Sequence, residues 1–147
     1  MYESYWQLSR TPFDNDADGA FFYRSDAHQA VLLKLRYLVE HHKGLGLLAG
    51  VGGTGKTFLA LQLQRELAAT HGPFVHLVFP QMSASELLAY LAVELGADES
   101  RVGNDAGGTD KTIRELQNLL GKYADERKHP VIFVDEAHLI EDPHVFQ

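Results

Sequence analysis

The run Gly50-Val51-Gly52-Gly53-Thr54-Gly55-Lys56-Thr57 fits the pattern GxxxxGKT. It follows a short apolar stretch, residues 45–49, and leads into a helical pattern that begins near Lys56. A strand, a glycine-rich loop and a helix in this order are the context that a phosphate-binding loop requires. Glycines adopt backbone torsions that a Cβ would forbid. Successive N–H groups can therefore turn inward around a phosphate at a helix N-terminus, where the helix dipole also favours an anion.

The last two residues of this loop add the chemistry of a nucleotide site. Lys56 supplies a movable positive charge for the β- and γ-phosphates, and Thr57 supplies a hydroxyl suited to Mg²⁺. We therefore predict that Lys56 binds nucleotide and takes part in catalysis, and that Thr57 is a metal ligand. The alternative, a glycine-rich turn with a surface lysine, leaves the flanking strand and helix patterns unexplained. The residues predicted to contact the nucleotide are Gly50, Val51, Gly52, Gly53, Thr54, Gly55, Lys56 and Thr57.

A second signal is an apolar run that ends in two acidic residues. Residues 131–134 are Val-Ile-Phe-Val, and Asp135 and Glu136 follow directly. Such a run predicts a strand buried on both faces of a parallel sheet, with the carboxylates at the strand end where ligands of open α/β sheets bind. We expect Asp135 to hold Mg²⁺, usually through water, and Glu136 to act as the general base. Alone, an acidic pair after a strand is equally typical of a helix N-cap, but the upstream phosphate loop favours the catalytic interpretation.

Composition restricts the classes of function. With 147 residues, of which 45% are hydrophobic and 22% charged, the chain is about one domain. The net charge of -7 argues against broad binding to nucleic acid or to an anionic membrane, although it leaves room for a local basic patch. The absence of cysteine excludes disulfides and thiolate zinc sites and fits a reducing compartment. No apolar run reaches the ~18 residues of a membrane helix, and the N-terminus lacks a secretory signal, so we predict a cytoplasmic protein without membrane insertion.

The remaining elements follow from periodicity and from capping residues. Ser25 is a plausible helix N-cap, and Ser83 with Glu86 has the order of a capping box. Residues 97–110 are rich in glycine and are expected to form a flexible loop. The segment from Tyr5 to Tyr23 is expected to be extended and anchored by its aromatic residues, which are Trp6, Phe13, Phe21 and Phe22. Helices are predicted over residues 25–42, 55–71, 83–96 and 111–127, and strands over residues 45–49, 74–79 and 131–134.

Three stretches together carry a family resemblance. They are the opening Tyr5…Leu8…Thr11-Pro12-Phe13, the block Phe21-Phe22-Tyr23-Arg24-Ser25…His28, and the loop through Thr57. They resemble the N-terminal part of the ATPases of the general secretion pathway protein A (ExeA) type, within the AAA+ superfamily, to which transposition-associated ATPases are related. The resemblance covers essentially the whole chain and is strongest over residues 5–62 and 131–138. It implies an ATP-driven, oligomer-forming machine, with the segment before the first helix covering the adenine.

The resemblance also implies the fold and the extent of the chain. We expect an α/β, three-layer P-loop NTPase fold with a parallel sheet. The chain ends at Gln147, before the sensor strand, arginine finger and helical lid of that family, so we interpret it as the N-terminal part of a longer protein. Within it, residues 1–24 would be an extended aromatic segment and residues 25–147 a partial AAA+ nucleotide-binding domain. In this family the sensor strand separates the phosphate-loop strand from the strand at 131–135, which would leave those two about 9–10 Å apart.

The function expected from these features is ATP binding and, in the complete protein, Mg²⁺-dependent hydrolysis. Hydrolysis would drive assembly or remodelling of a protein partner, in a secretion role and as a homo-oligomer. One alternative is a transposition-associated ATPase that acts with DNA, and another is a nucleotide-dependent switch without efficient hydrolysis. A third arises because Asp135-Glu136-Ala137-His138 spells the motif of DEAH-box helicases. Residues 74–130, however, contain no recognisable nucleic-acid motif and are not basic.

Overall fold

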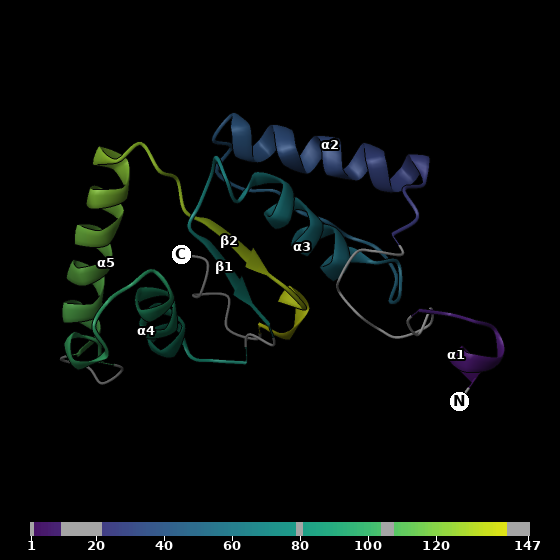
Figure 1. Cartoon of the computed structure of the whole chain (residues 1–147). Coiled ribbons are helices and arrows are strands. Elements are labelled where there is room, and N and C mark those ends of the chain that lie inside the picture. Colours follow the sequence, from purple (N-terminus) through teal and green to yellow (C-terminus); the bar gives the residue numbers. More distant parts are fainter. Residues whose placement is uncertain (1, 10–21, 79–80, 104–107, 141–147) are drawn as a thin grey trace. The chain divides into compact units, whose positions relative to one another are not determined.

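The computed structural model of the chain describes residues 2–9, 22–78, 81–103 and 108–140 (Figure 1). The chain divides into two compact units, Met1–Arg65 and Glu66–Gln147. The boundary falls near the end of helix α3 (Lys56–Leu67). Each unit is described by itself.

The first unit contains the helix that precedes the glycine-rich loop. Helix α2 (Asp26–Glu40) begins after Ser25, whose side-chain oxygen accepts the backbone N–H of His28 at 3.3 Å. This contact confirms the predicted N-cap, since an N-cap side chain satisfies one of the N–H groups that the first helical turn leaves without a partner. The predicted helix over 25–42 is thus confirmed, with slightly shorter ends.

Helix α3 follows the loop directly. The sequence predicted a helix over 55–71, and three of its leucines are buried, with exposed fractions of 3% for Leu59, 1% for Leu63 and 5% for Leu67. A spacing of four residues keeps these side chains on one stripe of the helix. Burial of that stripe fixes the helix, and with it the position of Lys56 at the first helical residue.

The strand predicted at residues 45–49 is absent. These residues form neither strand nor helix, and Leu45 and Leu47 are each 87% exposed. Apolar residues favour a strand only where a neighbouring strand supplies hydrogen-bond partners, and local composition does not provide that neighbour. The prediction of a strand was therefore wrong for the described chain. The separation expected between this segment and the strand at 131–135 stays a prediction.

The start of the chain also differs from expectation. Residues Tyr2–Tyr5 form a short helix, α1, where an extended segment was predicted. Trp6 is 68% exposed and contacts the Tyr5 ring edge-on at 5.1 Å, so it pairs locally and does not anchor the segment. Phe22 is half-buried and packs on Phe58 of α3, with ring centroids 4.7 Å apart, as an anchor would. Two predicted anchors, Phe13 and Phe21, lie outside the described residues.

The second unit contains a parallel sheet. Strands β1 (Phe74–Leu77) and β2 (Val131–Val134) pair in parallel, with Phe74 opposite Val131 and Leu77 opposite Val134. This confirms two predicted strands and their parallel direction. The expectation that β2 is buried on both faces was wrong, because Ile132 and Val134 are 42% and 36% exposed. Successive side chains of a strand point to opposite faces, so partial exposure of alternate residues means that one face of β2 is incompletely covered.

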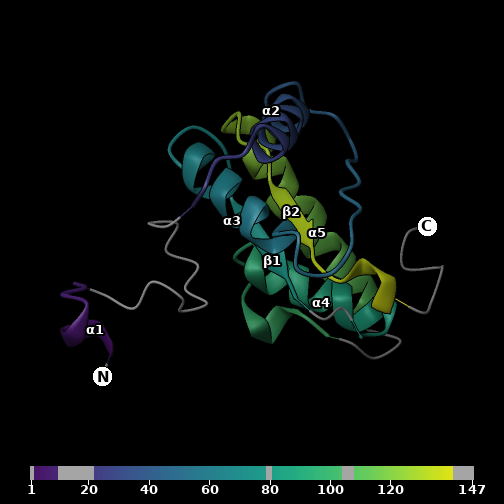
Figure 2. The same cartoon turned by 90° about the vertical axis from the view of Figure 1, so that its right-hand side faces the viewer.

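Helices α4 (Ala84–Glu94) and α5 (Gly108–Asp125) lie together on one side of this sheet (Figure 2). The core between them contains Val75, Leu95 and Leu119, all less than one tenth exposed. The predicted capping box is confirmed at the start of α4, where the Ser83 N–H donates to Glu86 Oε2 at 2.8 Å and the Glu86 N–H donates to Ser83 Oγ at 3.3 Å. The backbone and hydroxyl of Ser83 both donate to this carboxylate and lower the pKa of Glu86.

The described residues of the segment predicted as a flexible loop, 97–103 and 108–110, have more structure than expected, and residues 104–107 lie outside the described chain. A short 3₁₀ helix, η1 (Glu99–Arg101), has Asp98 as its N-cap, and α5 begins at Gly108 where the sequence predicted a start near Lys111. Thr112 is fully buried, and its hydroxyl accepts the Gly103 N–H at 3.1 Å. The same hydroxyl lies 2.9 Å from Gly103 O and 3.0 Å from Gly108 O, both within reach as acceptors of its proton. Side-chain hydrogen bonds to the backbone thus order the residues on both sides of this loop, which composition alone does not predict. Among the helices that the structure describes, none is long and apolar enough to span a bilayer.

Candidate functional site

The glycine-rich loop adopts a backbone conformation that favours glycine at two positions. Gly53 has φ +78° and Gly55 has φ +81°, in the left-handed region that other residues rarely enter. A Cβ at Gly52 or at Gly53 would meet no atom within 4 Å, so the space beside these two residues is open. The loop therefore combines the required backbone with room for a ligand at the N-terminus of α3.

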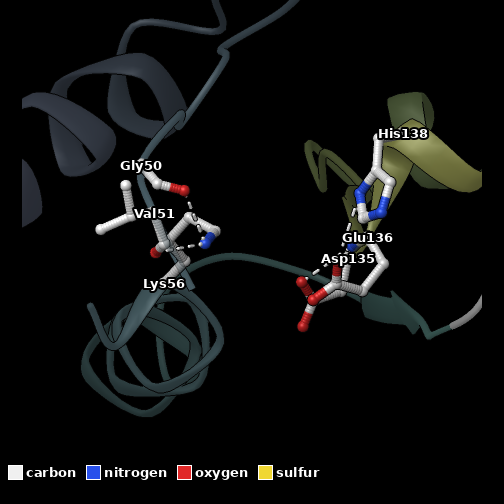
Figure 3. A network of polar contacts seen from close by, with 6 residues as sticks. All are labelled: Gly50, Val51, Lys56, Asp135, Glu136 and His138. Atoms are coloured by element: carbon white, nitrogen blue, oxygen red, sulfur yellow. Dashed lines mark hydrogen bonds and ion pairs between the residues drawn. The ribbon is translucent and has the colours of Figure 1, made fainter. Parts of the chain in front are cut away.

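The Lys56 side chain folds back over this loop. Its Nζ donates to the carbonyl oxygen of Gly50 at 3.0 Å and to that of Val51 at 3.1 Å (Figure 3). The Thr54 hydroxyl donates to the same Val51 oxygen at 2.9 Å. These neutral carbonyl oxygens hold the ammonium less strongly than a phosphate oxygen can, because the phosphate carries a full negative charge that attracts the ammonium. The two hydrogen bonds keep the Lys56 ammonium group beside the loop. When a phosphate binds, the ammonium group can exchange these carbonyl oxygens for phosphate oxygens. Thr57, the predicted metal ligand, is exposed in the first turn of α3.

A histidine contacts the loop from α2. His28 Nε2 lies 3.4 Å from the carbonyl oxygen of Thr54, and its Nδ1 lies 3.4 Å from the carbonyl oxygen of Tyr23. The Phe22 ring packs beside both the His28 ring, at 5.6 Å, and the Phe58 ring of α3. Sequence reasoning quoted this block for its resemblance but gave His28 no role. The contact joins residues 26 positions apart, and no local pattern signals it.

Asp135 continues the ladder beyond β2. Its N–H donates to the carbonyl oxygen of Leu77 at 2.8 Å, and its Oδ1 accepts the N–H of Glu136 at 2.9 Å. The side chain is 14% exposed. The predicted position of this carboxylate, at the carboxyl end of a parallel strand, is therefore confirmed. An oxygen ligand in such a place suits a divalent cation.

Glu136 has a strained backbone. Its φ is 49° and its ψ is 38°, a left-handed conformation that is uncommon outside glycine and that clusters at functional sites. Glu136 Oε2 lies 3.2 Å from His138 Nδ1. Figure 3 shows the two side chains pointing toward one another. Glu136 occupies the N-cap position of the 3₁₀ helix η2 (Ala137–Leu139), but its side chain makes no capping hydrogen bond. The alternative interpretation of the acidic pair as a helix cap thus lacks the contact that it requires.

A second histidine lies beside Asp135 from the neighbouring strand. His76 Nε2 is 3.8 Å from Asp135 Oδ2, and this nitrogen is buried without a hydrogen-bond partner among the described residues. Sequence reasoning gave His76 no role. Parallel strands end at the same edge of a sheet, and this rule is the signal that could have placed a polar residue of the segment 74–79 near Asp135.

The structure thus forms two groups of candidate residues. In the first unit Gly50, Val51 and Lys56 contact one another, and in the second unit Glu136 contacts both Asp135 and His138.

Comparison with known proteins gives a family and a relative. The family profile described as "AAA domain" matches residues 39–147. The chain is 31% identical over 143 residues to general secretion pathway protein A of Aeromonas hydrophila. The match covers 95% of this chain and 25% of that protein, so the chain spans about a quarter of the relative's length. No solved structure matches the chain.

Proposed function

Because this chain belongs to the AAA domain family and has its P-loop NTPase fold, we propose that it binds ATP through residues 50–57. The observation that carries the proposal is the loop itself. Gly53 and Gly55 have positive φ, and open space lies beside Gly52 and Gly53. The Lys56 ammonium rests on two carbonyl oxygens. A loop of this kind at the N-terminus of a helix is suited to a chain of phosphates.

Mg²⁺ is part of the same proposal. Thr57 and Asp135 would hold it, because a hydroxyl and a carboxylate at the end of a parallel strand are oxygen ligands of the kind it prefers. The low exposure of Asp135, and the backbone N–H that fixes its Oδ1, suit a carboxylate held ready for a ligand. When bound, Mg²⁺ neutralises charge on the phosphates.

Hydrolysis is proposed for the complete protein. Glu136 would accept a proton from the attacking water, and Lys56 would stabilise charge that grows on the phosphates. Glu136 Oε2 contacts His138 Nδ1 in this structure, so Glu136 would accept the proton on Oε1 or would exchange this contact for the water. His138 would then serve as its resting partner.

The cellular role is proposed from the relative. General secretion pathway protein A is named for secretion, which supports a secretion-type ATPase over a transposition-associated one. We propose that ATP turnover by a homo-oligomer, in the cytoplasm, drives assembly or remodelling of a protein partner. A switch without efficient hydrolysis remains the second candidate, whereas a DEAH-box helicase has no supporting feature among the described residues beyond residues 135–138.

Calorimetry with Mg-ATP tests the binding proposal. We expect Lys56→Ala to remove most of the affinity, since a charge-assisted contact contributes about 1.5–3 kcal/mol. Lys111→Ala, at an exposed lysine of α5, is the matched control and should bind like the parent. Equal affinities for the parent and for Lys56→Ala would remove the assignment of the loop.

The hydrolysis proposal has a separate test in the complete protein. Glu136→Gln keeps the size of the side chain but cannot accept a proton, so it should bind ATP and retain it unhydrolysed. Turnover at the parent rate by this variant would exclude Glu136 as the general base and favour the switch.

A further inference from the structure

We propose that His28 is a positioning residue for the phosphate-binding loop. By donating its Nε2–H to the carbonyl oxygen of Thr54, it orients the peptide group between Thr54 and Gly55 so that the Gly55 N–H faces the phosphate. This inference rests on the proposed function of residues 50–57. It adds a residue outside the loop on which the loop's anion-binding shape depends.

The other hydrogen bonds of the two carbonyl oxygens bear on which ring nitrogen of His28 carries the proton. Both ring nitrogens of His28 lie 3.4 Å from a carbonyl oxygen, but a neutral imidazole has only one N–H to donate. The Tyr23 oxygen, which faces Nδ1, already accepts the N–H of Ser25 at 3.0 Å. We therefore assign the proton to Nε2, where it is donated to the Thr54 oxygen.

The planar peptide bond between Thr54 and Gly55 links the direction of the Thr54 carbonyl to the direction of the Gly55 N–H. A trans peptide is planar, and its C=O and N–H point in opposite directions. When the Thr54 oxygen points to His28, the Gly55 N–H points away from His28. Gly55 has φ +81°, so this peptide lies where the loop turns sharply before α3. An N–H that already has this direction binds an anion more tightly than one that must reorient, because less conformational entropy is lost on binding.

The His28 ring is itself held in place. Ser25 caps the helix turn that carries His28, and the Phe22 ring packs against the His28 ring at 5.6 Å and the Phe58 ring at 4.7 Å. Phe58 belongs to the first turn of α3, one residue after the loop. The Phe22 ring thus packs against His28 of α2 and against Phe58 of α3. This packing holds the His28 ring in a position from which it can bind the Thr54 carbonyl oxygen.

Three substitutions separate the hydrogen bond to the loop from other effects. The amide nitrogen of His28→Gln reaches about as far as Nε2 and can donate to Thr54, whereas that of His28→Asn reaches about as far as Nδ1 and can donate only to Tyr23. His28→Ala removes both bonds. For Mg-ATP binding measured by calorimetry, we expect a loss of about fivefold in His28→Ala and in His28→Asn, as one neutral hydrogen bond contributes about 1 kcal/mol. His28→Gln should stay within about twofold of the parent.

Competition by inorganic tripolyphosphate shows which part of the nucleotide is affected. If His28 acts through the loop, His28→Ala should weaken tripolyphosphate and ATP by the same factor. Loss for ATP alone would mean that His28 contacts the base, and it would overturn the inference. Equal affinity of His28→Ala and the parent, or rescue by Asn in place of Gln, would also overturn it. The Lys56→Ala variant distinguishes this failure from failure of the proposed function, because full binding by Lys56→Ala removes the loop assignment itself.

Discussion

Substitution of Gly55 by alanine tests the loop conformation on which the proposed function depends. Gly55 has φ +81°, and a Cβ there would meet only His28 Nε2, at an ordinary contact distance of 3.9 Å. The substitution therefore creates no clash, and its cost comes from the backbone alone. Placing an L-residue in this region costs about 1–2 kcal/mol. This free energy must appear either as a lower free energy of unfolding or as weaker nucleotide binding. In the second case the dissociation constant for Mg-ATP would rise by a factor of about 5–30.

Gly52→Ala is the matched control in the same loop. Gly52 does not have a positive φ, and a Cβ there would meet no atom within 4 Å. In the absence of nucleotide we expect its free energy of unfolding to lie within about 0.5 kcal/mol of the parent. Urea denaturation and Mg-ATP calorimetry on both variants give the two quantities. If Gly55→Ala matches Gly52→Ala in stability and the parent in affinity, the described conformation of the loop is wrong.

Three further predictions concern other parts of the chain. Thr112→Val should lower the free energy of unfolding by about 1–3 kcal/mol relative to Thr112→Ser, because the Gly103 N–H loses its acceptor; equal denaturation midpoints would contradict this. The pKa of Glu86 is lowered, so its stabilising contribution is present above its ordinary pKa of 4.5 and is lost as pH falls through the lowered value. Glu86→Gln should therefore lose less stability than the parent on acidification below about pH 5. If the free energies of unfolding of the two proteins fall in parallel with pH, the Glu86 carboxylate does not contribute to stability. Trp6, the single tryptophan, should change its fluorescence on Mg-ATP binding if the N-terminal segment covers the adenine; a silent titration alongside proven binding counts against that contact.

The parts of the fold that the sequence predicted correctly are those with local signals. Ser83 and Glu86 lie one helical turn apart and satisfy each other, so their capping box could be recognised without knowledge of the rest of the chain. Leu59, Leu63 and Leu67 of α3 repeat every four residues, a helical spacing, and all three are buried. The two apolar runs that became β1 and β2 are short, bounded and rich in branched residues, which favour strands.

The parts that it missed depend on distant residues. Residues 45–49 have the composition of a strand but form none, since composition does not supply the neighbour that a strand needs. In the candidate site, the sequence identified Lys56 and Asp135 by motif. It did not reveal that His28 contacts the loop or that His76 lies beside Asp135, because both contacts join elements far apart in the chain.

The central claim is that residues 50–57 bind the phosphates of ATP, and the amide chemical shifts of those residues test it most directly. In a titration of the chain with Mg-ATP, followed by nuclear magnetic resonance, we expect the largest saturable shifts at the amides of Gly53, Gly55 and Lys56. The same titration of Lys56→Ala should produce little change. Saturable binding with its largest shifts elsewhere in the chain, or no shift in this loop at all, would contradict the account.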